Sequence, residues 1–326
     1  MIPARLAGTG SHLAGRLVAT REVAERAMPG KDPAEIERRI GIATRYWVEP
    51  GTTCADTAAA ALRMALDRAG LAASALRRLV FVSSTGGDTL IPATAHLVCD
   101  RLGLDDTCDA FDVNNSCAGF LTGLDLAARS VATGSGPVGV VVGEIFSRFL
   151  PAEKPRPYLV MGDAAAAAVI VPARDGEREG LLASALWSAA DLRREVTMDH
   201  PGRTGAPPFL QFDATYEDLT ASAVHALLKS SRAALDQAEL ALDDVAWFLP
   251  HQPNGWMLER ILAAIGLPAD RTIAVVGEIG SVGAASVPVS LDRLMRSGRV
   301  RPGDRILMAA VGAGTGYGAL LFQVGA

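Results

Sequence analysis

One cysteine stands where the chain could use it as a nucleophile. Cys117 follows a short apolar segment and directly precedes Ala118-Gly119, which begins a helix-like stretch. The first amide groups of a helix have no partner within the helix, and together with the helix dipole they favour a thiolate. Cys117 is therefore a candidate nucleophile, and the alternative from position alone is a small buried hydrophobic side chain. Cys54, Cys99 and Cys108 lack this setting.

One histidine is placed for acid–base chemistry. His251 lies in the sequence Pro250-His251-Gln252-Pro253-Asn254, directly after the apolar segment 245–249. Side chains beyond the carboxyl ends of strands gather at the sites of open α/β sheets. An imidazole there can act as a donor or as a base. Taken alone, His251 could equally be a structural histidine.

Two glycine-rich segments follow in the second half of the chain. The segment 312–318 follows an apolar strand and superficially suggests a dinucleotide loop, but the ten residues after Gly316 are typical of a strand and leave no room for the required helix. A backbone amide directed at an oxyanion is the functional interpretation, and a tight hairpin is the structural one. The segment 280–286 opens a helix. The chain contains no G-x-S-x-G sequence, which argues against a serine hydrolase of the nucleophile-elbow type.

Helical and strand signals alternate along the chain and predict an α/β fold. A helix is expected from Asp56, as its N-cap, to Ala69, with Gly70 as its C-cap. The apolar segments 79–82 and 138–142 are typical of buried strands.

A repeated sequence indicates that the chain has two similar halves. Residues 65–71, ALDRAGL, resemble residues 234–240, ALDQAEL, about half a chain length later, and an apolar strand segment follows each. The polar stretch 173–177 lies between them and is typical of a junction. We therefore predict an N-terminal half, 1–174, that carries Cys117, and a C-terminal half, 175–326, that carries His251.

Composition excludes several classes of protein. The 326 residues are 49% hydrophobic and 21% charged, which is typical of a globular protein and not of a disordered chain. The net charge of −5, without a basic run, argues against a nucleic-acid partner. The cysteine spacing predicts no metal site and a reduced, cytoplasmic protein. No apolar stretch reaches the ~18 residues that span a bilayer, so no membrane association is expected.

Four motifs together carry a family resemblance. They are Asp112–Phe120, Pro250–Asn254, Gly280–Pro288 and the C-terminal glycine loop. In order and spacing they resemble the β-ketoacyl-acyl-carrier-protein synthase III family of the thiolase superfamily. The resemblance implies a thiolase fold, in which two duplicated α/β halves stack as five αβαβα layers and two copies form a homodimer. It also implies substrates linked to phosphopantetheine, on coenzyme A or acyl carrier protein, and no further cofactor.

The resemblance also implies roles for individual residues. Cys117 would attack a thioester while the backbone amides of Cys117 and Ala313 hold the oxyanion. His251 would assist the second half-reaction, since covalent relay divides one acyl transfer into two easier steps. Arg39 and Asn254 match positions expected to contact the substrate.

Three departures from the family pattern change these expectations. Ser281 stands where the family has the asparagine of its catalytic triad, and losing an oxyanion donor costs roughly 2.7 to 4 kcal/mol. Glu35 replaces a tryptophan that stacks on the adenine of coenzyme A, which favours a carrier-protein substrate. Ile91 replaces the phenylalanine that reaches across the dimer to cap the acyl pocket, which predicts a larger or branched acyl group.

The leading hypothesis is therefore an acyltransferase of specialised, polyketide- or fatty-acid-related metabolism. In it, Cys117 accepts the acyl group and His251 serves as base for a thiol, hydroxyl or amine acceptor, without decarboxylation. One alternative is a Claisen condensing enzyme, decarboxylative or not, in which Ser281 suffices. The other is a catalytically silent partner subunit.

Overall fold

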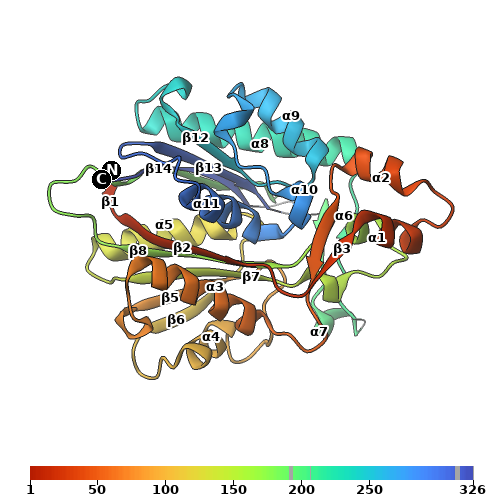
Figure 1. Cartoon of the computed structure of the whole chain (residues 1–326), viewed down its shortest axis with the longest axis horizontal. Helices are drawn as coiled ribbons and strands as arrows, with labels where there is room; N and C mark the ends of the chain where they lie inside the picture. Colours follow the sequence, from red (N-terminus) through yellow and green to blue (C-terminus); the bar gives the residue numbers. More distant parts are fainter. Residues whose placement is uncertain (191–193, 206, 313–315, 326) are drawn as a thin grey trace.

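The computed structural model describes residues 1–190, 194–205, 207–312 and 316–325. Two five-stranded sheets form its framework (Figure 1). In spatial order, the first sheet contains β2 (Arg5–His12), β8 (Ala164–Val171), β7 (Val138–Glu144), β5 (Arg78–Val82) and β6 (Asp109–Val113). The second contains β1 (Ile2–Pro3), β9 (Gly180–Ser188), β14 (Gly316–Gln323), β13 (Arg305–Val311) and β12 (Trp247–Pro250).

Both sheets are mixed, and their parallel strands are the ones that lead to the predicted site. Strand β5 pairs in parallel with β6 and β7, and β12 pairs in parallel with β13. Parallel neighbours end at the same edge of a sheet, so the segments that follow β5, β6 and β7 emerge together. The remaining pairings in the two sheets are antiparallel.

Helices complete five layers (Figure 1). Helices α3 (Cys54–Ala69) and α4 (Thr94–Leu102) cover the outer face of the first sheet, and α8 (Tyr216–Gln237) and α9 (Gly255–Ile265) lie outside the second. Between the sheets lie α5 (Gly119–Ala132) and α11 (Ser286–Arg296). The expected α/β thiolase fold, with two stacked halves in an αβαβα arrangement, is confirmed.

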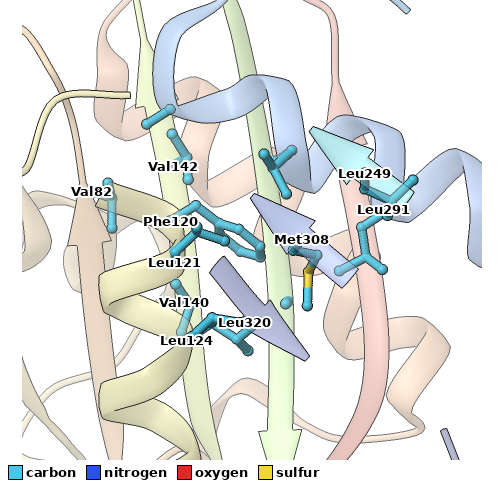
Figure 2. Close-up of a cluster of buried hydrophobic side chains, with 14 of the residues drawn as sticks. Val82, Phe120, Leu121, Leu124, Val140, Val142, Leu249, Leu291, Met308 and Leu320 are labelled. Carbon is cyan, nitrogen blue, oxygen red and sulfur yellow. The ribbon is translucent and has the colours of Figure 1, made fainter. Parts of the chain in front are cut away.

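The central core explains why α5 lies between the sheets. Phe120, Leu121 and Leu124 of this helix are buried between valines of the first sheet and Met308 and Leu320 of the second (Figure 2). Each such side chain contributes roughly 1.5 to 3 kcal/mol when fully buried. This apolar band fixes α5, and with it the turn that carries Cys117.

Smaller elements flank the layers. They are β3 (Arg16–Ala19), α1 (Thr20–Ala27), α2 (Pro33–Ile40), β4 (Thr44–Trp47), α6 (Pro155–Val160), β10 (Val196–Thr197), α7 (Pro201–Thr204), β11 (Gln211–Phe212), α10 (Val276–Ile279) and the 3₁₀ turn η6 (Gly283–Ala285).

No helix among the described residues combines the length and apolarity that crossing a membrane requires.

One predicted helix start is wrong. Helix α3 begins at Cys54, and its N-cap is Thr53, not Asp56. Thr53 Oγ1 accepts a hydrogen bond from the Asp56 backbone amide, and the Asp56 carboxylate accepts one from the Thr53 amide. Asp56 therefore serves as the third residue of a capping box, a position that also favours an acidic side chain.

The predicted repeat lies at equivalent places in the two halves. Residues 65–71 end α3, and residues 234–240 end α8, and each helix packs on the sheet of its own half. Strand β8 ends at Val171 and β9 begins at Gly180, while β1 from the start of the chain joins the second sheet. The boundary at 174/175 stays a prediction.

The two halves end these equivalent helices with different residues in the same backbone conformation. Gly70 has φ +67° and Glu239 has φ +55°. The left-handed region costs a residue with a Cβ roughly 1 to 2 kcal/mol, whereas glycine adopts it freely. Glu239 therefore carries local strain that Gly70 avoids.

We predict that Glu239→Gly raises the free energy of unfolding by about 1 kcal/mol, because it removes this strain. Gly70→Ala is the matched reverse change, and it should lower the free energy of unfolding by a similar amount, because it places a Cβ on a left-handed residue. No atom lies within 4 Å of the added Cβ, so no steric clash contributes. Urea unfolding of both variants measures the effects. Destabilisation by Glu239→Gly would contradict the prediction.

Candidate active site

A tight turn carries Cys117 from β6 to α5. The Ala118 amide donates to the Asn115 carbonyl at 3.1 Å, and the Gly119 amide donates to the Ser116 carbonyl at 2.9 Å. Ser116 has φ +47°, a conformation that few residues with a side chain adopt and that clusters at functional sites. Cys117 therefore lies two residues before the first residue of α5, partly exposed.

The C-terminal glycine segment lies directly against this turn. A Cβ added at Gly312 would be 2.8 Å from the Ser116 Cβ and 3.3 Å from the Cys117 amide nitrogen. A Cβ at Gly316 would overlap the Asn115 side chain. The second half of the chain therefore needs glycine here to approach the nucleophile turn. Ala313 lies outside the described residues, so its oxyanion role stays a prediction.

His251 follows β12 and is held by its neighbour Gln252. The His251 amide donates to the Ala309 carbonyl at 2.7 Å, and the Gln252 amide donates to Ser286 Oγ at 3.0 Å. The Gln252 side chain is fully buried, and its hydrogen bonds reach Ser290 Oγ and the backbone of Ile273, Val275 and Val276. This network ties the histidine loop to α11 and to the segment before α10.

The His251 imidazole is neutral. The residue is 4% exposed, and its buried Nδ1 has no hydrogen-bond partner among the described residues. Burial disfavours the charged form and lowers the pKa of His251 to about 4. At neutral pH the ring therefore holds one proton and can accept another.

Ser281 is held by its backbone and has a free side chain. Its amide donates to the Val160 carbonyl at 2.8 Å, and its carbonyl accepts from the Gly162 amide at 2.9 Å. The residue is 5% exposed, and its Oγ forms no hydrogen bond with another described residue. The hydroxyl is thus available to a ligand.

One cavity brings these three side chains together. Its volume is about 1040 Å³, and Cys117, His251 and Ser281 all line it. Much of the remaining wall is apolar, from elements of both halves, and includes Phe146, Phe149, Leu159, Leu210, Met257 and Val311. Such a cavity accepts an apolar chain next to a small number of polar groups.

Of the other residues predicted to contact the substrate, Arg39 and Asn254 line the cavity. Arg39 is exposed and lines the cavity from α2, so it lies at the mouth, and Glu35 is exposed one turn earlier. Asn254 lines the cavity but caps α9: its Oδ1 accepts from the Met257 amide at 2.8 Å and from the Tyr216 hydroxyl at 2.9 Å. Of the Asn254 side chain, only the NH₂ group remains for a ligand.

Ile91 does not line the cavity of the single chain. It is 90% exposed, whereas the neighbouring Leu90 lines the cavity and is itself 71% exposed. The role predicted for Ile91 concerns a second copy of the chain, so it stays a prediction.

Several cavity residues were missed in the sequence. Tyr216 and Arg156 line the cavity from α8 and α6, where ordinary helical patterns gave no signal. Tyr216 packs against Trp256 with ring centroids 4.8 Å apart. Glu144 ends the apolar strand β7, and a charged residue in that position is a signal that could have been found.

In the described chain, no group of three or more His, Cys, Asp or Glu side chains is placed to hold a metal ion.

Comparisons of the sequence with known proteins all indicate one family. The profile of the 3-oxoacyl-[acyl-carrier-protein (ACP)] synthase III family matches residues 111–190, and its C-terminal profile matches residues 235–324. A beta-ketoacyl-[acyl-carrier-protein] synthase III of Rhizorhabdus wittichii is 35% identical over 314 residues, which cover 96% of each chain.

Solved structures give the same result. The 3-oxoacyl-(acyl carrier protein) synthase III of Pseudomonas aeruginosa PAO1 has a TM-score of 0.89 and 28% identity, with 99% of each chain covered. The priming beta-ketosynthase of the R1128 polyketide biosynthetic pathway has a TM-score of 0.89 and 27% identity, covering 99% of this chain and 96% of its own. With its fold, its motifs and these relatives in agreement, the chain belongs to the 3-oxoacyl-[acyl-carrier-protein] synthase III family.

Proposed function

We propose that this protein is an acyltransferase that moves an acyl group from a thioester through Cys117 to an acceptor nucleophile. The observation that carries the proposal is the shared cavity, in which Cys117, a neutral His251 and the free hydroxyl of Ser281 line one largely apolar chamber. A nucleophile, a proton acceptor and a hydrogen-bond donor are the groups that a two-step acyl transfer needs.

The first step is transthioesterification. Cys117 Sγ attacks the thioester carbonyl, the new C–S bond forms, and the donor's C–S bond breaks as the donor leaves as a thiol with the proton of Cys117. The strained turn before α5 holds the sulfur in place for attack. Backbone amides stabilise the oxyanion, with Cys117 and Ala313 as the proposed donors.

The second step empties the enzyme. The acceptor attacks the acyl carbon, and His251, neutral because it is buried, takes the acceptor's proton and returns it to the departing Cys117 thiolate. The Ser281 hydroxyl donates a hydrogen bond to the reacting oxygen.

The substrates we propose are thioesters of phosphopantetheine. Arg39 at the mouth offers a cation to a phosphorylated ligand, while Glu35 on the same helix offers no stacking surface for a nucleotide. This favours acyl carrier protein over free coenzyme A. The large apolar cavity suits a medium or branched acyl chain of polyketide- or fatty-acid-related metabolism.

We further propose that the protein is a cytoplasmic homodimer. The exposed pair Leu90 and Ile91, next to the cavity, is the apolar surface that a second copy would cover. Light scattering that gives the single-chain mass of 33.9 kDa would contradict this assembly.

A condensing enzyme is the second candidate, and the name of the Rhizorhabdus relative favours it. Its second step would form a carbon–carbon bond, with loss of carbon dioxide when the acceptor is a malonyl thioester. Ser281 would then replace a two-hydrogen amide donor with a single hydroxyl.

Acyl loading and transfer can be measured separately. After exposure to a panel of acyl-coenzyme A and acyl-carrier-protein thioesters, the intact mass of the wild type should increase by one acyl group. Cys117→Ala should show no adduct, and the control Cys108→Ala should load normally. His251→Ala should load but transfer the acyl group to the amine acceptor glycinamide about 10²- to 10⁴-fold more slowly. Equal loss of both steps would contradict the assigned role of His251.

The residue at 281 should decide between the two reactions. We expect the wild type to release little carbon dioxide from malonyl carrier protein after loading, because a serine hydroxyl is shorter than an asparagine amide and donates one hydrogen where the amide has two. Ser281→Asn should raise the release of carbon dioxide about tenfold or more. Product-coupled release of carbon dioxide by the wild type would instead support the condensing enzyme.

The neutral state of His251 should appear in the pH dependence of stability. As pH falls from 7 to 5, the unfolded chain takes up a proton near the ordinary pKa of 6.5, while the folded chain, with a pKa of about 4, does not. The free energy of unfolding therefore falls, by on the order of 2 kcal/mol from this group. In urea unfolding, the decrease in the free energy of unfolding between pH 7 and pH 5 should be smaller by this amount in His251→Gln. The control His225→Gln, at an exposed position, should show the same decrease as the wild type. Identical pH profiles of wild type and His251→Gln would contradict the buried neutral imidazole.

A further inference from the structure

Glu144 is a buried carboxyl group at the end of β7. The residue is 1% exposed, and it forms no ion pair with a described lysine, arginine or histidine. Burying an unpaired carboxylate is costly, and the cost is reduced when hydrogen-bond donors surround it. Burial accordingly raises the pKa of Glu144 to about 7, against the opposing effect of its hydrogen bonds.

The donors around Glu144 come from both halves of the chain. Oε1 accepts from the Ser84 amide at 3.0 Å, from Ser84 Oγ at 2.5 Å and from the Ala284 amide at 3.0 Å. Oε2 accepts from the Ser84 amide at 3.1 Å and from Ser83 Oγ at 3.4 Å. One carboxylate thus joins the ends of β5 and β7 in the first sheet to η6 in the second half.

Two of these partners connect Glu144 with the cavity. Ser84 lines it, and Ala284 lies three residues after Ser281. The intervening Gly283 has φ +53°, and a Cβ there would be 2.9 Å from Glu144 Oε1 and 2.7 Å from the Phe146 ring. The segment 281–284 therefore rests directly on the carboxylate. Its other end is held through the hydrogen bonds of Ser281 with Val160 and Gly162.

We propose that Glu144 is a positioning residue that holds the Ser281 segment at the correct distance from the cavity wall at Ser84. The inference rests on the proposed function, because it assigns Ser281 to the second step of acyl transfer. Glu144 itself touches no reacting atom. It acts by giving two segments from different halves one common acceptor, so that the Ser281 hydroxyl is fixed before the acceptor binds.

Three variants separate this role from simple structural support. Glu144→Gln keeps an oxygen at Oε1 for Ser84 and Ala284, and its amide group can donate to Ser83 Oγ. Glu144→Asp keeps the carboxyl group but is one methylene shorter, so it cannot reach both halves. Glu144→Leu removes every hydrogen bond.

The test measures the two steps on the full-length protein by intact mass. Decanoyl-coenzyme A serves as the loading probe and the amine glycinamide as the acceptor. We expect all three variants to load Cys117 within about threefold of the wild type. The second step should slow about tenfold or more in Glu144→Asp and Glu144→Leu, and Glu144→Gln should retain most of the rate. In a Ser281→Ala background, Glu144→Asp should cause no further slowing, because the group it positions is gone.

The outcomes are distinguishable. Unchanged transfer by folded Glu144→Asp, or slowing that adds fully to that of Ser281→Ala, would overturn the positioning role and leave the proposed function intact. If Glu144→Leu does not fold, the comparison of Glu144→Asp with Glu144→Gln still decides. Absence of any wild-type adduct from a donor panel would overturn the proposed function itself, and the inference with it.

Discussion

The site depends on how closely the two halves approach each other at the nucleophile turn. Gly312 lies against Ser116 and the Cys117 amide, and Gly316 lies against Asn115, with no room for a side chain at either glycine. Within this turn, the backbone of Ser116 is in the left-handed region. A strained turn persists when its surroundings fix it, and here the central helix α5 fixes it from one side and the glycine segment from the other.

This approach buries polar groups, and their chemistry follows from the burial. His251 is neutral because it is buried between the halves. Glu144 holds its proton more tightly than an exposed carboxyl group for the same reason. The two groups respond in opposite senses: burial lowers the pKa of the imidazole and raises the pKa of the carboxyl. Each is therefore driven toward its uncharged form near neutral pH. The carboxyl is compensated by amides from both halves, whereas the imidazole Nδ1 has no partner in the described chain.

Local signals in the sequence predicted the α/β class and the strands before Cys117 and His251, whereas the five-layer fold and the position of Ser281 followed from the family resemblance. Glycine after the α3 helix, apolar strands of four to seven residues and the repeated ALD sequence are patterns of near neighbours. The start of α3 was misplaced because aspartate favours both the N-cap and the third position, and only the hydrogen bonds of Thr53 separate the two.

The features of the site that the sequence could not predict depend on contacts between residues far apart in the chain. Tyr216 and Arg156 reach the cavity only because α8 and α6 pack beside it, and neither helix carries a pattern that marks this. The cap formed by Asn254 removes half of the side chain that the family resemblance assigned to the substrate.

The most direct measurement is the rate of acyl loading in Gly312→Ala, with Gly277→Ala as the matched control. An added Cβ at Gly277 makes only an ordinary contact of 3.6 Å, whereas one at Gly312 must displace the nucleophile turn. If the close approach of the halves positions Cys117, the second-order rate constant for adduct formation falls about tenfold or more in Gly312→Ala and is unchanged in the control. Wild-type loading by folded Gly312→Ala would contradict this account.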